Sequence, residues 1–369
     1  MAGSIYGTIF RISTWGESHG DGIGVVVDGC PAGLPLERSD IQKFLNRRKP
    51  GQSRYSTPRK ESDTVEIMSG VFEGKTTGTP ISMIVRNTNQ RSGDYSEIAS
   101  YYRPGHADYT FDEKYGFRDY RGGGRSSGRE TIGRVAAGAI ASKLLAELGI
   151  TLTTYTRSIG PVTIESFDEE EIFQNALYMP DADAASKAEA YLEECLSQHN
   201  SSGGCVECVV HGIPTGIGDP VFEKLDANLA KALMSIGAVK GVEVGDGISV
   251  ATATGLTNND PFSIDENGSI TKKTNHAGGV LGGISDGSDL VLRASFKPTP
   301  SIWSAQQTVN RNHEEIQINI KGRHDPIIVP RAVVVVESMA ALTIIDALMV
   351  GMSSRLSNLK LIWDQKPCD

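Results

Sequence analysis

The sequence of 369 residues predicts a mixed fold in which helices and strands form one large unit. Short runs of β-branched and apolar residues, typical of strands, recur along the chain, and three segments carry apolar residues at helical spacing. No Ser/Gly/Pro-rich linker or low-complexity run divides the sequence, although it contains 41 glycines. Length alone allows two domains or one large one. We therefore expect a single domain over residues 1–369.

The predicted elements are as follows. Strands are expected at residues 24–28, 81–86, 206–211, 290–296 and 332–337. Helices are expected to begin near Ser39 and to cover residues 130–148 and 223–235, followed by Gly149 and Gly237 as stop signals. Charged residues interrupt the apolar region 326–350, which favours a buried strand and helix over a membrane span.

Two segments resemble each other at an offset of 183 residues, since 209 − 26 = 183. Residues 26–33 and 209–216 each read as a strand end with a Gly/Pro turn, and each precedes a predicted amphipathic helix. One interpretation is an internal duplication with halves near 1–195 and 196–369; the other is a chance match of common turn residues.

Composition excludes several classes of protein. The net charge of −9 and the pI near 5.4 argue against a nucleic-acid binder, which usually carries a basic excess. Five cysteines fit a reducing compartment better than a disulfide scaffold. The first ten residues do not resemble a signal peptide, so we expect a cytoplasmic protein. Cys205 and Cys208 lie in a predicted strand that separates their side chains, so no metal site is expected.

The most specific motif is the run of Gly and Arg at residues 121–130, before the second predicted helix. Ser127 and Glu130 have the spacing of a capping box. Glycines allow the backbone to approach a ligand, and a helix N-terminus attracts anions. We therefore favour anion binding, with Arg125 and Arg129 adding positive charge. The run is neither a Walker A loop nor a dinucleotide-binding fingerprint.

Two histidines lie in glycine-flanked turns, His19 in residues 16–20 and His106 in residues 103–108. An imidazole titrates near neutral pH and suits proton transfer. Asp108 is spaced either to orient His106 or to be solvated. From these segments alone, each turn is equally well read as an ordinary surface loop.

Further candidates are basic or glycine-rich. Residues 47–60 contain six basic residues and no acid, which fits a solvated face or the wall of a cationic cleft. Residues 322–326 join a cation, an imidazole and a carboxylate on one turn. Residues 275–283 and 297–301 read as loops that let the backbone approach a ligand.

Together these motifs resemble the chorismate synthase family along nearly the whole chain. The Gly-Glu-Ser-His-Gly turn at residues 16–20, the Gly-Arg-Ser-Ser-x-Arg-Glu run at 124–130 and the Arg-x-Asp-Pro turn at 323–326 match its three signature regions. The loops at residues 48–54 and 103–108 match as well.

The resemblance implies a fold, a reaction and an assembly. The fold class is α+β: one large domain in which antiparallel sheets are sandwiched with helices. The reaction is the trans-1,4-elimination of phosphate from 5-enolpyruvylshikimate 3-phosphate to give chorismate. It requires reduced FMN (FMNH2) without net redox change. The assembly is a homotetramer.

The resemblance also assigns roles to residues. His106 would protonate the departing phosphate, His19 would donate a proton to the flavin, and Asp325 would remove a proton with help from Ser18 and Ser127. The polyanionic substrate would be bound by Arg48, Arg54, Arg103, Arg129 and Arg323. Flavin contacts would come from Arg125, Ser126, Ser127, Gly237, Ala238, Gly282, Lys297, Pro298, Thr299, Pro300, Ser301 and Arg323.

Two positions depart from the family pattern. Gly237 stands where relatives often carry a side-chain amide, and Trp15 stands where a smaller aromatic residue is common. The sequence has no nicotinamide-binding fingerprint and no large insertion, so we expect an external flavin reductase rather than intrinsic NADPH oxidation. A non-catalytic relative that only holds flavin or an anion is the main alternative, and the presence of His19, His106 and Asp325 argues against it.

Overall fold

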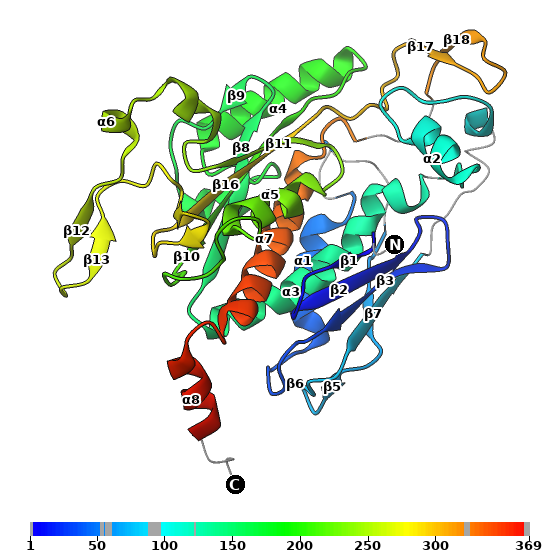
Figure 1. Cartoon of the computed structure of the whole chain (residues 1–369). Helices are drawn as coiled ribbons and strands as arrows, with labels where there is room; N and C mark the ends of the chain where they lie inside the picture. Colours follow the sequence, from blue (N-terminus) through cyan, green and yellow to red (C-terminus); the bar gives the residue numbers. More distant parts are fainter. Residues whose placement is uncertain are drawn as a thin grey trace.

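The computed structural model describes residues 3–51, 55, 61–87, 97–121, 123–320 and 325–364. Two five-stranded antiparallel sheets enclose a layer of helices (Figure 1). The first sheet has the order β1-β2-β3-β7-β4. Its strands are β1 (Ile5–Tyr6), β2 (Arg11–Gly16), β3 (Gly22–Asp28), β4 (Val65–Ile67) and β7 (Ile81–Arg86).

The second sheet has the order β11-β16-β10-β8-β9. Its strands are β8 (Thr151–Ile159), β9 (Val162–Thr163), β10 (Gly204–His211), β11 (Val239–Val244) and β16 (Leu290–Phe296). In β16, Leu290, Leu292, Ala294 and Phe296 alternate with more exposed residues and face the core. This alternation is what a half-buried strand requires, because successive side chains point to opposite faces of a sheet.

Four helices fill the space between the sheets. They are α1 (Arg38–Arg48), α3 (Thr131–Glu147), α5 (Leu225–Met234) and α7 (Val329–Gly351). Helix α3 packs on β3 and α7 packs on β8 and β10, while α3 and α7 pack against each other. At their crossing, a Cβ added to Gly138 would lie 2.2 Å from the Cβ of Ser338. Small residues along α3 therefore bring the two helix axes close together.

Helix α7 corrects one prediction. Residues 332–337 were expected as a strand followed by a helix, but they lie inside a single helix of 23 residues. Three consecutive turns of this helix are buried between the sheets, so burial on all sides overrides the β propensity of its four consecutive valines. Among the described helices, α7 alone has the length and apolar composition to cross a membrane, and here it is a buried core helix.

Most other predicted elements are confirmed. The predicted helices near 39, 130–148 and 223–235 correspond to α1, α3 and α5. The strands predicted at 24–28, 81–86, 206–211 and 290–296 correspond to β3, β7, β10 and β16. The predicted sandwich of antiparallel sheets and helices is also confirmed.

The two sheets repeat one pattern of connections. In each sheet the central strand, β3 or β10, is followed by a glycine turn and a helix, α1 or α5, and later by a neighbouring antiparallel strand, β7 or β16. Each pattern then ends in a long core helix, α3 or α7. The chain passes to the second sheet between α3 and β8, which is well before residue 195. The duplication itself stays a prediction, which this shared order supports.

Smaller elements surround the core. They are β5 (Val71–Phe72), β6 (Lys75–Thr76), α2 (Asp108–Tyr115), α4 (Ala182–Ser197), α6 (Gly255–Asn258), β12 (Phe262–Ile264), β13 (Ile270–Lys272), β14 (Val280–Leu281), β15 (Ile284–Ser285), β17 (Gln306–Val309), β18 (Glu315–Ile318) and α8 (Leu356–Asp364). The β12–β13 hairpin and α8 project from the body, whereas α2 and the β17–β18 hairpin lie together at the opposite end (Figure 1).

Candidate active site

The sequence motifs gather where the N-termini of α3 and α7 meet the C-terminus of α1. Arg48, the last residue of α1, donates to the carbonyl oxygen of Gly128 (3.3 Å) and to Thr131 Oγ1 (3.4 Å) at the start of α3. Its own carbonyl oxygen accepts from Arg331 Nε (3.1 Å) near the start of α7. Two long helices therefore direct their positive ends towards one region, an arrangement that favours anions.

The run before α3 departs from the predicted capping box. The chain forms two short 3-10 turns, Gly124–Ser126 and Gly128–Glu130, and α3 begins only at Thr131. Ser127 Oγ accepts from the backbone of Arg129 (3.4 Å), but the carboxylate of Glu130 accepts from Thr14 Oγ1 (3.0 Å) and Arg134 Nε (2.8 Å). Glu130 thus ties the helix start to β2 instead of capping it.

Arg125 is used to attach this run to β2. Its guanidinium donates to the carbonyl oxygens of Gly16 (3.0 Å) and Thr14 (3.2 Å) and to Thr14 Oγ1 (2.6 Å). Gly16 begins the turn that carries His19. The predicted flavin-binding arginine therefore holds the His19 turn against the glycine-rich run.

Arg48 and Arg129 share one buried carboxylate. Asp63 accepts from Arg48 NH2 (2.9 Å) through Oδ2 and from Arg129 NH1 (3.2 Å) through Oδ1. The side chains of Asp63 and Arg48 are 0% and 1% exposed, and Arg129 also pairs with Glu61. Burial lowers the pKa of Arg48, and Asp63 opposes that shift. The Arg48 guanidinium does not face solvent in this arrangement, so it acts on its surroundings through Asp63 and the start of α3.

An amide connects Arg129 to the His19 turn. Asn87 Oδ1 accepts from Arg129 NH2 (2.8 Å), while Asn87 Nδ2 donates to the carbonyl oxygens of Glu17 (2.9 Å) and Gly20 (2.8 Å). Inside the turn, Ser18 Oγ lies 3.2 Å from His19 Nδ1, and both side chains are buried. Asn87 therefore holds the turn that carries the predicted acid–base residues, together with Arg125 at Gly16.

Asp325 joins the same network from the other side. Its Oδ2 accepts from Arg331 NH1 (2.7 Å), and the same guanidinium donates to the backbone of Arg48. A continuous chain of polar contacts thus runs from the His19 turn through Asn87, Asp63 and Arg331 to Asp325.

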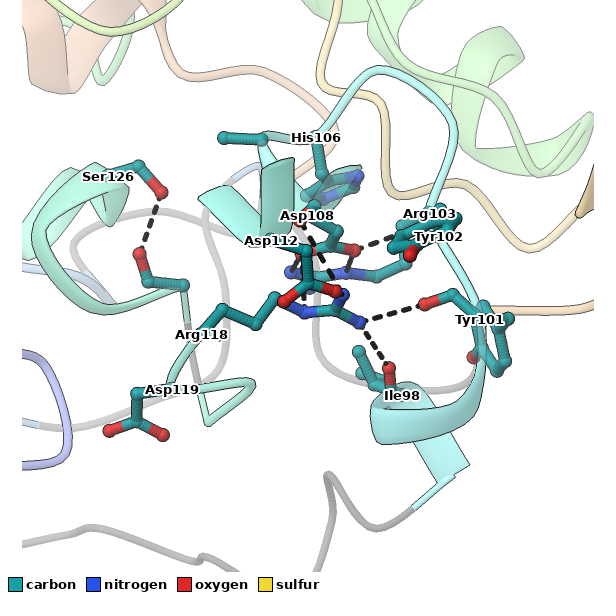
Figure 2. A network of polar contacts seen from close by, with 12 residues as sticks. Ile98, Tyr101, Tyr102, Arg103, His106, Asp108, Asp112, Arg118, Asp119 and Ser126 are labelled. Carbon is teal, nitrogen blue, oxygen red and sulfur yellow. Dashed lines mark hydrogen bonds and ion pairs between the residues drawn. The ribbon is translucent and has the colours of Figure 1, made fainter. Parts of the chain in front are cut away.

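The second histidine lies in a turn fixed by ion pairs (Figure 2). The carboxylate of Asp108 accepts hydrogen bonds from Arg103 Nε and NH2, each 2.7 Å long. It accepts a third from the backbone N of Arg103 (3.0 Å). Asp108 therefore orients Arg103, and His106 instead contacts the Pro104 carbonyl oxygen through Nδ1 (2.9 Å) and Ser301 Oγ through Nε2 (3.0 Å). Arg118 lies behind this turn and reaches two backbone carbonyl groups (Figure 2).

The environment of His106 favours the neutral imidazole. Burial and the neighbouring Arg103 guanidinium lower the pKa of His106 to about 4. Lys297, whose Nζ donates to the carbonyl oxygen of Gly105 (2.9 Å), acts in the same direction. An anion bound beside the ring would raise this pKa, because a negative charge stabilises the imidazolium.

The loop at residues 297–301 connects the two histidine regions. Besides the Ser301 contact to His106, the carbonyl oxygen of Thr299 accepts from Ser201 Oγ (2.7 Å), and Ser202 N donates to the carbonyl oxygen of Pro326 (2.9 Å). Thr299 Oγ1 is buried without a hydrogen-bond partner among the described residues. An orphaned buried hydroxyl in the loop that contacts His106 fits a ligand that supplies its partner.

The other expected flavin contacts lie partly along this loop. Lys297 N donates to the carbonyl oxygen of Ala238 (2.9 Å), and Arg134 NH1 donates to Ser235 Oγ (2.6 Å), so the end of α5 lies beside both the loop and α3. A Cβ added at Gly237 would meet no described atom within 4 Å, which leaves room for a ligand. Gly282 lies near the first residue of α5, whereas Gly237 follows its last residue. Because α5 has ten residues, its two ends are about 15 Å apart.

Some expected site residues lie outside the described residues. They are Arg54, with most of the basic stretch after Gly51, and Arg323 with its neighbour His324. Of the remaining candidates, the structure brings together Ser18, His19, Arg48, Arg129, Ser127 and Asp325 in one group and Arg103, His106 and Ser301 in another.

Sequence reasoning missed the residues that connect these groups. Asp63, Asn87 and Arg118 stand outside the motifs, and no local pattern marks them. Arg331 had a weak signal, since a charge inside an apolar run must find a buried partner. The Ser201–Ser202 pair likewise precedes a strand in a run of small polar residues.

Comparison with known proteins decides the family. The family model for chorismate synthase matches residues 10–349. The chain belongs to the chorismate synthase family. The chorismate synthase of Agathobacter rectalis is 71% identical over 97% of this chain and 98% of its own length. That of Lachnoclostridium phytofermentans is 66% identical over 99% of this chain and 100% of its own length.

Structural comparison agrees. A crystal structure of chorismate synthase superposes with a TM-score of 0.76 at 30% identity, covering 97% of both chains. The family, fold class and type of enzyme predicted from the motifs are therefore confirmed: a lyase of the shikimate pathway, which serves aromatic amino acid biosynthesis. Its small substrate agrees with the expectation that the protein does not bind nucleic acid.

Proposed function

We propose that the protein eliminates phosphate from 5-enolpyruvylshikimate 3-phosphate to form chorismate, with reduced FMN as cofactor. The observation that carries this proposal is the continuous polar network from the His19 turn to Asp325, which lies at the N-termini of two core helices. Such a region suits a substrate with a phosphate and two carboxylates.

The arginines of the network would bind and orient the anionic groups. Among the described arginines proposed to bind substrate, Arg129 and Arg103 are the most exposed. The guanidinium of each is oriented by an ion pair with a carboxylate. Arg48 lies deeper and would set the position of Asp63 and the start of α3. Arg54 and Arg323 are proposed as further substrate contacts from the sequence resemblance.

Proton transfer would be divided between two regions. His106 is neutral in this environment, and the arriving phosphate would raise its pKa so that it becomes the acid for the leaving group. His19, next to Ser18, would protonate the cofactor. Asp325 would accept a proton, and Arg331 would hold its carboxylate in position until then. Ser127, at the start of the second 3-10 turn, would assist Asp325.

The described residues fit a bound flavin. Thr299 offers an orphaned buried hydroxyl, Gly237 offers open space, and Arg125 and Ser126 lie within the glycine-rich run. Ala238, Pro298 and Pro300 are proposed as backbone contacts. Gly282 is proposed from the sequence resemblance alone, since it lies at the other end of α5. Reduced FMN would lend electron density to the allylic system of the substrate, whose C–H bond is not acidic enough for simple base catalysis. The protein would orient the substrate, exclude water and hold the protons.

Anaerobic turnover tests the function. The purified protein is mixed with chemically reduced FMN and the phosphorylated substrate, and phosphate and chorismate are measured together. Equal amounts of both products support the proposal, whereas binding of both ligands without either product would support the non-catalytic alternative. In the same assay, His106→Ala should lower kcat by about 10²- to 10⁴-fold while substrate affinity changes little.

The substrate site is tested separately. Arg48→Ala should weaken binding of the full substrate, because Asp63 and the start of α3 lose the buried cation that fixes them beside Arg129. A phosphate-free analogue should be affected less if this region holds the phosphate. Unchanged binding of the full substrate at low salt would remove Arg48 from the site.

We further propose a cytoplasmic homotetramer that receives reduced flavin from a separate reductase. The family resemblance supports the tetramer, and the small number of cysteines in the sequence supports a reducing compartment. Sedimentation at micromolar concentration would test the tetramer directly.

A further inference from the structure

Arg118 is a buried cation that none of the assigned roles uses. Its side chain is 3% exposed and lies in the segment after α2, before the glycine-rich run. A buried guanidinium is costly unless its donors are satisfied. Arg118 NH1 and NH2 have acceptors, whereas Nε has none among the described residues, so the contacts of NH1 and NH2 indicate what the protein uses this side chain for.

Those contacts surround the backbone that leads into the His106 turn. Arg118 NH2 donates to the carbonyl oxygens of Ile98 and Tyr101, each at 2.9 Å (Figure 2). Its guanidinium lies 5.2 Å from the centre of the Tyr102 ring. One side chain thus fixes the residues immediately before Arg103 from two directions.

The same guanidinium reaches the acidic side of α2. Arg118 NH1 pairs with Asp112, and Arg118 Nε lies 4.0 Å from Asp108 Oδ1. Asp108 in turn holds Arg103 through two bonds of 2.7 Å, and the carbonyl oxygen of Arg103 accepts from His106 N (3.2 Å). The order of contacts is therefore Arg118, Asp108, Arg103 and His106.

We propose that Arg118 is a positioning residue that fixes the turn carrying Arg103 and His106 before substrate binds. It touches neither the substrate nor the cofactor in the proposed function. It acts by donating to the carbonyl groups before the turn and to the backbone carbonyl oxygen of Asp108 (3.5 Å) behind it, while its charge faces the carboxylates of Asp112 and Asp108. The expected effect of Arg118 on turnover rests on the proposed role of His106. The expected effect of Arg118 on the conformation of the turn does not depend on that role.

The charges around His106 make the proposal measurable. The groups facing the ring from neighbouring elements are Arg103, Asp108 and Lys297, with the hydroxyl of Ser301. Behind them, Arg118 and Arg311 pair with Asp112. Removing the Arg118 charge leaves Asp108 and Asp112 with one fewer cation, so the imidazolium becomes easier to form.

Two variants separate charge from geometry. Arg118→Met removes the cation at similar length, and Arg118→Lys keeps it but cannot span two carbonyl groups and two carboxylates. The pKa of His106 is measured by NMR in the ligand-free protein, and kcat and KM are measured anaerobically. We expect the pKa of His106 to rise in Arg118→Met, because Asp108 loses a neighbouring cation, and to stay near the wild-type value in Arg118→Lys. We expect kcat to fall by about 10²-fold in Arg118→Met and less in Arg118→Lys, with little change in KM.

Arg293→Met is the matched control. Arg293 also pairs with a buried carboxylate, Glu207, and donates to a backbone carbonyl oxygen, that of Gly245 (2.6 Å), but its partners lie on β10 and after β11 in the second sheet, not in the His106 turn. It should lower thermal stability without moving the pKa of His106. A folded Arg118→Met protein with an unchanged His106 pKa and an unchanged kcat would overturn the proposal. A raised pKa with unchanged kcat would leave Arg118 as the positioning residue and contradict the role of His106 as the acid.

Where Arg118→Met does not fold, Asp108→Asn tests the next step of the same path. It keeps the shape of the side chain and removes the charge that holds Arg103. The released Arg103 should lose its fixed orientation, and kcat should fall while the fold is kept. Unchanged kcat and His106 pKa in a folded Asp108→Asn protein would contradict the proposed path.

Discussion

At the scale of single residues, the site depends on side chains that complete backbone turns. Asn87 is the clearest case, because its amide donates to two carbonyl oxygens of the His19 turn while its oxygen accepts from Arg129. Without that amide, the carbonyl oxygens of Glu17 and Gly20 would each lose one donor, and Arg129 would lose one partner. Each such loss costs about 1–3 kcal/mol where the group is buried.

We therefore predict that Asn87→Asp lowers both kcat and thermal stability. The carboxylate still accepts from Arg129, but it cannot donate to Glu17 and Gly20, so the His19 turn loosens. Asn358→Asp is the control, since Asn358 also donates to a carbonyl oxygen, that of Met352 (3.1 Å), on the exposed helix α8. Anaerobic turnover and thermal unfolding check the prediction, and equal behaviour of the two variants would contradict it.

His106 should also affect stability as the pH changes. Its pKa falls from 6.5 to about 4 on folding, because of burial and Arg103, so the unfolded chain binds the proton more readily. The unfolding free energy therefore keeps its full value above about pH 6.5. As the pH falls towards 4, the preference of the unfolded chain for the proton lowers the unfolding free energy by about 3 kcal/mol. His106→Gln should lose less unfolding free energy than the wild type between about pH 7 and pH 4.

Urea unfolding at several pH values measures this difference. His199→Gln provides the control for the replacement of a histidine by glutamine at an exposed position. Parallel curves for the wild type and His106→Gln would show that His106 titrates equally in the folded and unfolded chain.

At the scale of elements, the crossing of α3 and α7 holds the two halves of the site together. Gly138 has no space for a side chain, since an added Cβ would lie 2.2 Å from Ser338 Cβ and 2.6 Å from Ser338 Cα. We predict that Gly138→Ala lowers the unfolding free energy by about 1–3 kcal/mol, because the helices must move apart. Such a shift also displaces the start of α3, so activity should fall in proportion.

Gly255→Ala is the matched control for this crossing. Gly255 begins α6, and a Cβ there would meet no described atom within 4 Å. Alanine should therefore be neutral or slightly stabilising at that position. Denaturant unfolding compares the two variants, and a neutral Gly138→Ala would mean that the helices adjust freely.

The elements also separate what sequence predicts from what it does not. The alternation of residues in β16 and the helical spacing in α3 are local, so both were predicted correctly. The valines of α7 prefer strands locally, and only burial between two sheets makes them helical. The motifs of the site were visible in the sequence, but Asp63 and Asn87 gain their roles through Arg129, which is distant in the chain. Arg118 gains its role from backbone carbonyl groups that no local pattern specifies.

At the scale of the whole molecule, the repeated topology gives the site its location. Because each half ends in a long core helix, the N-termini of α3 and α7 meet near the C-terminus of α1. Residues from both halves therefore complete one polar network, and neither half contains the site alone. This arrangement explains why the motifs are spread from residue 16 to residue 326 along the chain.

The architecture of the whole molecule also bears on the source of the reduced flavin. The two sheets and their helices account for the described core, and the sequence has neither a dinucleotide fingerprint nor a large insertion. The motifs with anion-binding character are already used by the proposed substrate and flavin. We therefore predict no intrinsic flavin reductase activity.

The protein should be active anaerobically with chemically reduced FMN and inactive aerobically with NADPH and FMN alone. Adding a separate flavin reductase and NADPH without oxygen should restore activity. Because the reaction has no net redox change, a catalytic amount of reduced flavin should support many turnovers. The decisive measurement is chorismate formed from NADPH, FMN and highly purified protein without reductase or chemical reductant. Sustained formation there would reveal a nicotinamide site in this chain, and Arg48→Ala would then test whether the basic stretch supplies it.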